Sequence, residues 1–221
     1  MTPTKPRRRR TRPPATLVLY VRHGQTPTTG ARLPGRAPGL HLAEAGVAQA
    51  HATAERIAPL GDKVAAVYAS PLERAQETAR PIAKALGLRV RTERGLNECD
   101  FGEWTGRELK ELYKLPEWQT VQRYPSGFRF PGGESFVEMQ TRFTETVARL
   151  CARHGGGAVV AVSHADPIRA AVAAAMGTHL DLFQRTVVSP CSVTAIAYGT
   201  GGPVVLTVNS TGGTLGELKP A

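Results

Sequence analysis

The sequence has few cysteines and no long hydrophobic run. Its three cysteines, Cys99, Cys151 and Cys191, are far apart and form no CxxC pair, so they indicate neither a disulfide framework nor a structural metal site. No apolar run approaches the ~18 residues of a membrane span, and residues 16–21 are too few for the core of a signal peptide. We therefore expect reduced thiols, no membrane span and a cytoplasmic location.

Motifs of several enzyme classes are also missing. The sequence has no G-x-x-x-x-G-K-[ST] loop, no G-x-G-x-x-G fingerprint and no G-x-S-x-G nucleophile turn. Its six histidines form no H-x-x-x-H or H-E-x-x-H pair, which are spacings typical of metal ligands on a helix. We expect neither a metal nor a cofactor.

The positive charge is concentrated at one end of the chain. Six of the net ten positive charges belong to lysine and arginine residues within residues 1–15, a segment without acids. Such a proline-flanked basic segment is typically solvated and disordered, so we expect no specific nucleic-acid partner. Docking of this segment to nucleic acid, a membrane or an acidic partner remains an alternative. We divide the chain into a disordered tail (1–15), one catalytic domain (16–210) and a flexible C-terminal tail (211–221).

Short apolar runs alternate with segments of helical periodicity. Residues 16–21, 64–68 and 158–162 are rich in β-branched residues and read as strands buried on both faces. Apolar residues at helical spacing predict helices near 43–57, 75–86, 136–150 and 168–175. This order predicts an α/β fold, a doubly wound and mostly parallel sheet with helices on both faces.

Local signals refine this expectation. Ser70 and Ser135 each precede a glutamate by three residues, which predicts two helix N-caps, and Gly87 and Gly177 stand where helices should end. Residues 192–198 and 204–208 predict a hairpin or two sequential strands. The stretch at about 105–133 interrupts the alternation and predicts a small lid insertion over a pocket.

Cationic and imidazole side chains follow all three predicted strands. Arg22 and His23 follow the first, Arg74 lies just beyond the second, and His164 follows the third. Ligands of open α/β sheets bind outside the carboxyl ends of the strands, so these side chains should converge. Two arginines and two histidines beside helix N-termini suit an anion, above all a phosphoryl group.

Motifs that follow one another along the chain resemble those of the histidine phosphatase superfamily, the group that contains the cofactor-dependent phosphoglycerate mutases. They are LYVRHGQT (19–26), GLHLAEAGVAQA (39–50), YASPLERAQETA (68–79), LNECDFGEWTG (96–106, similar to α-ribazole phosphatases), and GGES (132–135) with VSH (162–164). The resemblance implies that His23 is the phosphorylated nucleophile, and that Arg22, Arg74 and His164 hold the phosphoryl oxygens. It further implies that Glu98 is the proton donor.

Neighbouring residues carry weaker expectations. Gln25 and Thr26 are candidates to donate hydrogen bonds to the ester, and Thr29 stands where family members often have a phosphate-binding asparagine. The resemblance implies a metal-independent phosphomonoesterase acting on a small phosphorylated metabolite through phosphohistidine. The alternatives are a phosphoglycerate mutase-like phosphomutase and a catalytically weak binding protein that uses its basic tail. The physiological substrate, the attacking nitrogen and the oligomeric state are not determined at this level.

Overall fold

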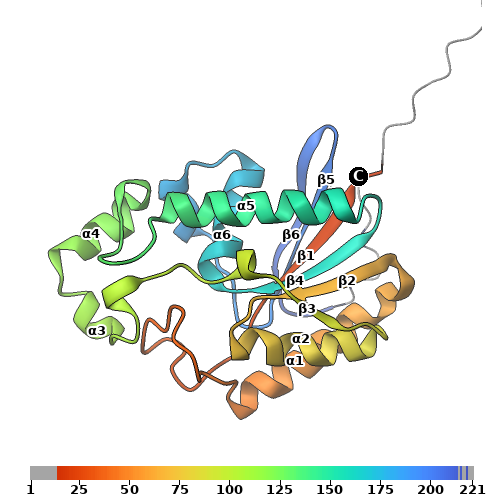
Figure 1. The fold of residues 1–221 in the computed structure, drawn as a ribbon, viewed down its shortest axis with the longest axis horizontal. Coiled ribbons are helices and arrows are strands. Elements are labelled where there is room, and N and C mark those ends of the chain that lie inside the picture. The colour runs from red at the N-terminus through yellow and green to blue at the C-terminus, as the bar shows by residue number, and fades with distance from the viewer. Residues whose placement is uncertain (1–13, 214, 216–217, 219–221) are drawn as a thin grey trace, which may run out of the picture.

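A six-stranded mixed sheet forms the centre of the protein (Figure 1). The structure is a computed structural model that describes residues 14–213, 215 and 218. The strands are β1 (Thr16–Arg22), β2 (Val64–Ala69), β3 (Val90–Thr92), β4 (Ala158–Ser163), β5 (Val193–Gly199) and β6 (Gly202–Ser210). They lie in the order β3-β2-β4-β1-β5-β6. The first four are parallel, whereas β5 runs antiparallel to β1 and β6 antiparallel to β5.

Four long helices cover the two faces of this sheet (Figure 1). The helices α1 (Glu44–Ile57) and α2 (Glu73–Ala85) pack their apolar residues on one face. The helices α5 (Phe136–Arg153) and α6 (Ala165–Met176) pack theirs on the other. Alternate residues of β1 belong to the two core clusters, because successive side chains of a strand point to opposite faces. The predicted doubly wound, mostly parallel α/β fold is confirmed.

The register of the central strands brings their carboxyl ends to the same level. In the β1–β4 pair Arg22 lies opposite Ser163, and the backbone N–H of His23 donates to the carbonyl of Ser163 at 2.9 Å. The residues that follow both strands therefore enter the same space at one edge of the sheet. Short 3-10 helices complete the connections: Ala58–Lys63, Arg94–Leu96, Gly102–Trp104, Pro125–Gly127 and Leu180–Arg185.

The predicted insertion forms two short helices, α3 (Leu109–Leu112) and α4 (Pro116–Arg123). They extend the molecule beyond the sheet on the side of α5's N-terminus (Figure 1). A third hydrophobic cluster holds this region together, with Trp104, Phe128 and Phe130 in edge or tilted contact at 5.0–5.4 Å. These aromatic contacts give the insertion a core of its own.

The helix ends test the local predictions. Ser135 accepts from the backbone N–H of Glu138 while the Glu138 carboxylate accepts from that of Ser135, which confirms the capping box of α5. Gly177 ends α6 in the left-handed conformation, as predicted. The prediction for Ser70 is wrong, because α2 begins at Glu73 after Leu72 and the Ser70 hydroxyl makes tertiary contacts instead.

The sequence pattern missed one strand, and one predicted segment lies outside the residues that the structure describes. The strand β3 has only three residues, one half-buried and two exposed, and no apolar pattern, so periodicity did not reveal it. The predicted basic tail falls almost entirely on residues 1–13, which lie outside the described residues. In the predicted C-terminal tail, Leu215 is buried and Leu218 packs against the core on the α1–α2 face. No helix of the described residues is long and apolar enough to cross a membrane.

Candidate active site

His23, Arg74 and His164 come together at the carboxyl ends of the strands. The ring centroids of the two histidines lie 5.2 Å apart, and Nη2 of Arg74 lies 3.4 Å from Nδ1 of His164. All three side chains are almost completely buried. The convergence expected from three separate strand ends is therefore what the fold produces.

The ring of His23 is held by its neighbour's backbone. Nδ1 lies 2.8 Å from the carbonyl oxygen of Gly24, and because a carbonyl only accepts hydrogen bonds, Nδ1 carries the ring hydrogen. Nε2 therefore has the lone pair. The turn is fixed from outside, since the N–H of Gly24 donates to the Thr78 hydroxyl at 3.0 Å. A Cβ at Gly24 would lie 2.6 Å from the carbonyl oxygen of Gly46, so the turn packs directly against α1.

Buried guanidinium groups present free donors to this space. Arg74 is fully buried and donates from Nη2 to the carbonyl of Gly35 at 2.7 Å. Its Nε and Nη1, and Nε of Arg22, are buried without a hydrogen-bond partner among the described residues. Arg22 is anchored by a 2.7 Å bond from Nη1 to the carbonyl of Val188. Buried unpaired donors are costly, and an anion would satisfy them.

His164 is oriented by a chain of two polar residues. Ser70 donates its hydroxyl hydrogen to Oδ1 of Asn97 at 2.9 Å, so its oxygen must accept from Nε2 of His164, also at 2.9 Å. Nδ1 of His164 then carries the lone pair and faces Arg74. Ser70 thus acts on the site and not on the helix start that the sequence predicts.

Both histidines are held in the neutral form. Burial lowers the pKa of His23 well below its usual value, and the positive charges of Arg74 and Arg22 lower it further. Burial and Arg74 also lower the pKa of His164. A neutral His23 keeps the lone pair of Nε2 available at neutral pH.

Glu98 is buried and protonated near neutral pH. Burial and the negative charge of Asp166 raise its pKa to about 8, against the opposing effects of the Cys99 N–H, Arg74 and Arg22. Its Oε1 accepts from the N–H of Cys99 at 2.9 Å. Glu98 can therefore hold a proton that an ordinary surface glutamate would have lost.

The weaker sequence candidates make other contacts. Thr26 is buried, but its hydroxyl lies 3.0 Å from that of Thr29, which also accepts from the Thr26 N–H at 2.8 Å. The two threonines thus fix their own loop. Gln25 is exposed, and its backbone N–H donates to the side chain of Gln49 at 3.0 Å.

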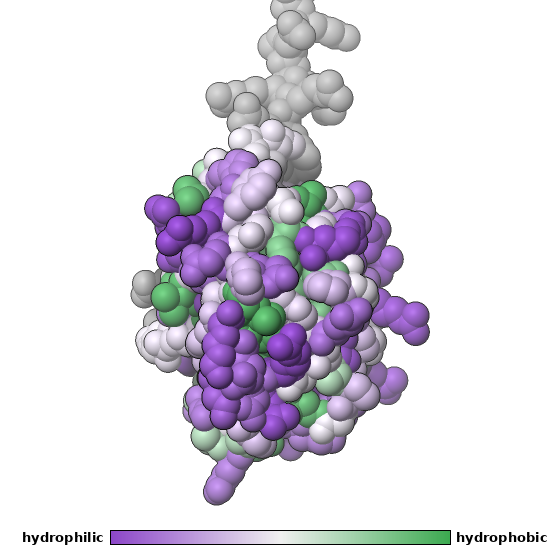
Figure 2. Space-filling view, turned by 90° about the vertical axis from the view of Figure 1, so that its left-hand side faces the viewer, coloured by the Kyte–Doolittle hydropathy of each residue, from purple (hydrophilic) through white to green (hydrophobic). Residues whose placement is uncertain are grey.

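A cavity of about 500 Å³ opens under the insertion. Tyr113 and Trp118 from the insertion line one side, and Asp166 and Arg169 from α6 line the other. Figure 2 looks onto this end of the molecule and shows small hydrophobic patches among hydrophilic side chains. Asp166 lines this cavity, and its negative charge also contributes to the raised pKa of Glu98.

The described part of the chain offers no arrangement for a metal. Within it, no group of three or more histidine, cysteine, aspartate or glutamate side chains is placed to hold an ion. Arg74 and Arg22, whose positive charges act on His23, instead carry buried donors without a partner.

Several residues around the site escaped the sequence reasoning. Arg36, Arg142 and Asp166 contact or influence the proposed groups but belong to no quoted motif, and Asn97 lies within the motif at 96–106 but was given no role. The position of Arg142 was one signal that could have been used. It lies three residues after the core residue Met139 and directly before the core residue Phe143, which places a cation next to the buried face of α5. Because a charged side chain is rarely buried unless it is paired, this position indicates that Arg142 has partners in the fold.

A doubly wound domain with neutral histidines beside arginines that carry unpaired buried donors defines an α/β protein with a site suited to an anion. Residues 18–211 match the family described as "Histidine phosphatase superfamily (branch 1)", and the chain belongs to it. The resemblance seen in the sequence is thereby confirmed.

Relatives and solved structures agree with this assignment. "Bifunctional protein Rv2228c" of Mycobacterium tuberculosis is 36% identical over 95% of this chain, and the match covers 58% of that longer relative. "Phosphoserine phosphatase 1" of Hydrogenobacter thermophilus is 31% identical, over 75% of this chain and 79% of that protein. The structure of mycobacterial glucosyl-3-phosphoglycerate phosphatase Rv2419c is 27% identical, with a TM-score of 0.79 over 89% of this chain and 99% of that one.

Proposed function

We propose that the protein is a metal-independent phosphomonoesterase that works through a phosphohistidine on His23. One observation carries this proposal: the lone pair of Nε2 lies in a buried space with unpartnered donors of Arg22 and Arg74. Membership of the histidine phosphatase superfamily and the similarity to named phosphatases support it.

In the first step, Nε2 of His23 attacks phosphorus and the bond to the ester oxygen breaks. Arg22, Arg74 and His164 surround the phosphoryl oxygens, and the two guanidinium groups neutralise their charge. The proton of Glu98 passes to the departing oxygen, which leaves as an alcohol. Gln25, Thr26 and Thr29 belong to the loop that follows β1. They contribute to substrate binding through the shape of that loop, since the two threonine hydroxyls bond to each other.

In the second step, water attacks the phosphohistidine. Glu98, now a carboxylate, takes a proton from the water as the N–P bond breaks, and inorganic phosphate leaves. His23 is then neutral again and Glu98 is protonated, so the cycle closes without a metal ion.

The substrate is proposed to be a small phosphorylated metabolite whose alcohol part occupies the cavity of about 500 Å³. Its aromatic wall and the polar side chains of Asp166 and Arg169 suit a molecule with both ring or carbon surface and hydroxyl groups. The cytoplasmic location stays part of the proposal and is supported by three free thiols.

Trapping the intermediate tests the proposal. Wild-type protein is treated, in the presence of EDTA, with a phosphoester whose phosphoryl group carries a radioactive label. It should form a labelled phosphoprotein that is labile in acid and stable in base. The variant His23→Ala should form none, whereas His51→Ala, which changes an exposed histidine of α1, should match the wild type. A requirement for added metal, or equal labelling of the His23 variant, contradicts the mechanism.

The alternatives give different products. A phosphomutase would transfer the label to a second hydroxyl of a phosphoglycerate and release little inorganic phosphate. A binding protein would show no turnover at all, and its ligand binding would depend on residues 1–14. Release of inorganic phosphate that is unchanged by deletion of residues 1–14 supports the phosphatase.

A further inference from the structure

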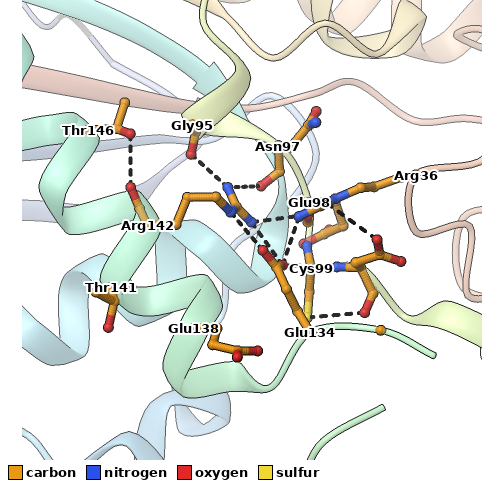
Figure 3. Close-up of polar contacts among 12 residues, drawn as sticks. Arg36, Gly95, Asn97, Glu98, Cys99, Glu134, Glu138, Thr141, Arg142 and Thr146 are labelled. Carbon is orange, nitrogen blue, oxygen red and sulfur yellow. Dashed lines mark hydrogen bonds and ion pairs between the residues drawn. The ribbon is translucent and has the colours of Figure 1, made fainter. Parts of the chain in front are cut away.

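Arg142 reaches from α5 into the loop that contains Glu98. Its Nη1 donates to the carbonyls of Gly95 and Asn97 at 2.7 and 3.2 Å, and its Nη2 donates to the carbonyl of Glu98 at 3.3 Å. Figure 3 shows the guanidinium group pointing into the curve of this loop. One side chain therefore collects three backbone acceptors around the proposed acid.

Glu134 fixes both Arg142 and the other end of the loop. Its carboxylate accepts from Nε and Nη2 of Arg142 at 2.8 and 3.1 Å, and also from the N–H of Asp100 at 3.1 Å. Its own N–H donates to the carbonyl of Asp100 at 2.9 Å. A Cβ at Gly133 would lie 2.3 Å from that carbonyl oxygen, so the two segments touch backbone to backbone.

Arg36, in the loop between β1 and α1, also contacts Glu98 and Glu134. Its Nε donates to the carbonyl of Glu98 at 2.9 Å, and its Nη2 lies 2.8 Å from Oε2 of Glu134 (Figure 3). The Glu98 carbonyl thus accepts from two guanidinium groups that come from residues 106 positions apart in the sequence. The side chains of Arg142 and Glu134 are mostly buried, at 24% and 17% exposure.

We propose that Arg36, Glu134 and Arg142, the Arg36–Glu134–Arg142 cluster, are positioning residues that hold the Glu98 carboxyl at the place where it delivers its proton. The inference rests on the proposed function, because it assigns the cluster's purpose to the acid of that mechanism. None of the hydrogen bonds or ion pairs of these three residues is to His23, Arg74 or His164, so they hold Glu98 through the backbone of residues 95–100. The charge of Arg142 also lowers the pKa of His164, and Arg142→Lys retains that charge.

The energetics favour a positioning purpose over simple stabilisation. Replacing a mostly buried ionic network with apolar residues is often neutral or stabilising, so such networks are not needed for stability alone. A proton donor, by contrast, must stay within hydrogen-bond reach of the departing oxygen, and a displacement of about 1 Å costs on the order of a hundredfold in rate. Burial raises the pKa of Glu134, but the bonds from Arg142 and Asp100 and the charge of Arg36 lower it overall, so the cluster stays ionised.

The test compares two esters in the full-length protein. Glu134→Gln and Arg142→Lys should lower kcat/KM for β-glycerol phosphate on the order of tenfold or more, because its alkoxide needs the proton. Both should change kcat/KM for p-nitrophenyl phosphate little, since nitrophenolate leaves unaided. The matched controls Glu138→Gln and Arg149→Lys change side chains of α5 that lie outside the cluster and should leave both values unchanged.

A double-mutant cycle separates positioning from general damage. Adding Glu134→Gln to Glu98→Gln should cause no further loss for β-glycerol phosphate, because the acid is already gone. Equal losses for the two esters, or losses that add in the double variant, would overturn the inference.

A second measurement is independent of turnover. Backbone amides of residues 95–102 should exchange hydrogen faster in Glu134→Gln than in Glu138→Gln. Equal exchange would overturn the inference whether or not the wild type is active. Failure of the proposed function itself would appear elsewhere, as a wild-type protein that forms no phosphohistidine.

Discussion

The ring centroids of His23 and His164 lie 5.2 Å apart with an interplanar angle of 59°. Each ring uses one nitrogen for a fixed hydrogen bond, Nδ1 of His23 to Gly24 and Nε2 of His164 to Ser70. Two protonated rings at this separation would repel each other, and Arg74 beside them adds to that cost. The pair is therefore neutral, and Nε2 of His23 keeps its lone pair near the charges of Arg74 and Arg22.

The pH dependence of kcat/KM should follow the ionisation of the Glu98 carboxyl. Its acid form is lost as the pH rises through about 8, so kcat/KM for an alkyl phosphate should fall above that pH by about tenfold per pH unit. Glu98→Gln should have a low and flat profile over the same range. A wild-type profile that stays level to pH 10, or rises, would exclude Glu98 as the acid.

The same group should make stability depend on pH. The carboxyl binds its proton more tightly in the folded protein, with a pKa of about 8, than in the unfolded chain at 4.5. Its contribution to the free energy of unfolding is thus fully present below 4.5 and lost as the pH rises through 8, by at most about 1.4 kcal/mol per pH unit. Urea unfolding should show Glu98→Gln gaining on the wild type across this window. A constant difference between the two proteins would refute the raised pKa.

Arg74 should account for phosphate binding. Inorganic phosphate in EDTA should raise the Tm of the wild type, because it satisfies the unpaired donors of the folded protein. Arg74→Met should lose this shift and lower kcat/KM on the order of a hundredfold or more. The control Arg80→Met changes an exposed arginine of the same helix and should retain both. A phosphate shift that survives in Arg74→Met would place the anion elsewhere.

Tyr113 should affect large substrates only. It is 55% exposed and lines the cavity, so Tyr113→Ala should raise KM for phosphoesters of bulky or ring-bearing alcohols and leave phosphoserine unaffected. Tyr124→Ala is the matched control, since that tyrosine is equally exposed, at 57%, outside the cavity lining. Steady-state kinetics on a series of esters measures the effect. Equal effects of the two variants would show that the cavity does not hold the alcohol.

Two serines that look alike in the sequence should behave differently. Ser135→Ala removes a helix cap and should cost about 1 kcal/mol of unfolding free energy with kcat/KM unchanged. Ser70→Ala should lower both, because it also leaves Nε2 of His164 without its partner. Urea unfolding and kcat/KM, measured on both variants, distinguish the roles. Unchanged kcat/KM in Ser70→Ala would remove Ser70 from the site.

The failed prediction for Ser70 shows what limits a local pattern. A serine three residues before a glutamate predicts a cap only if no stronger partner is near. At Ser135 the helix N–H is the nearest donor, whereas at Ser70 the fold brings Asn97 and His164 within 2.9 Å. The local pattern could not reveal these two hydrogen bonds, because the partners are 27 and 94 residues away along the chain.

The sequence by itself determined the fold and the meeting place of His23, Arg74 and His164. Strands buried in a parallel sheet appear in the sequence as continuous apolar runs. The carboxyl ends of parallel strands all lie at the same edge of the sheet. Tertiary structure alone decided which nitrogen of His23 is free, why Glu98 retains its proton, and how Arg36, Glu134 and Arg142 hold its loop. Tautomers and pKa values depend on burial and on distances between residues remote along the chain, and no local pattern encodes those distances.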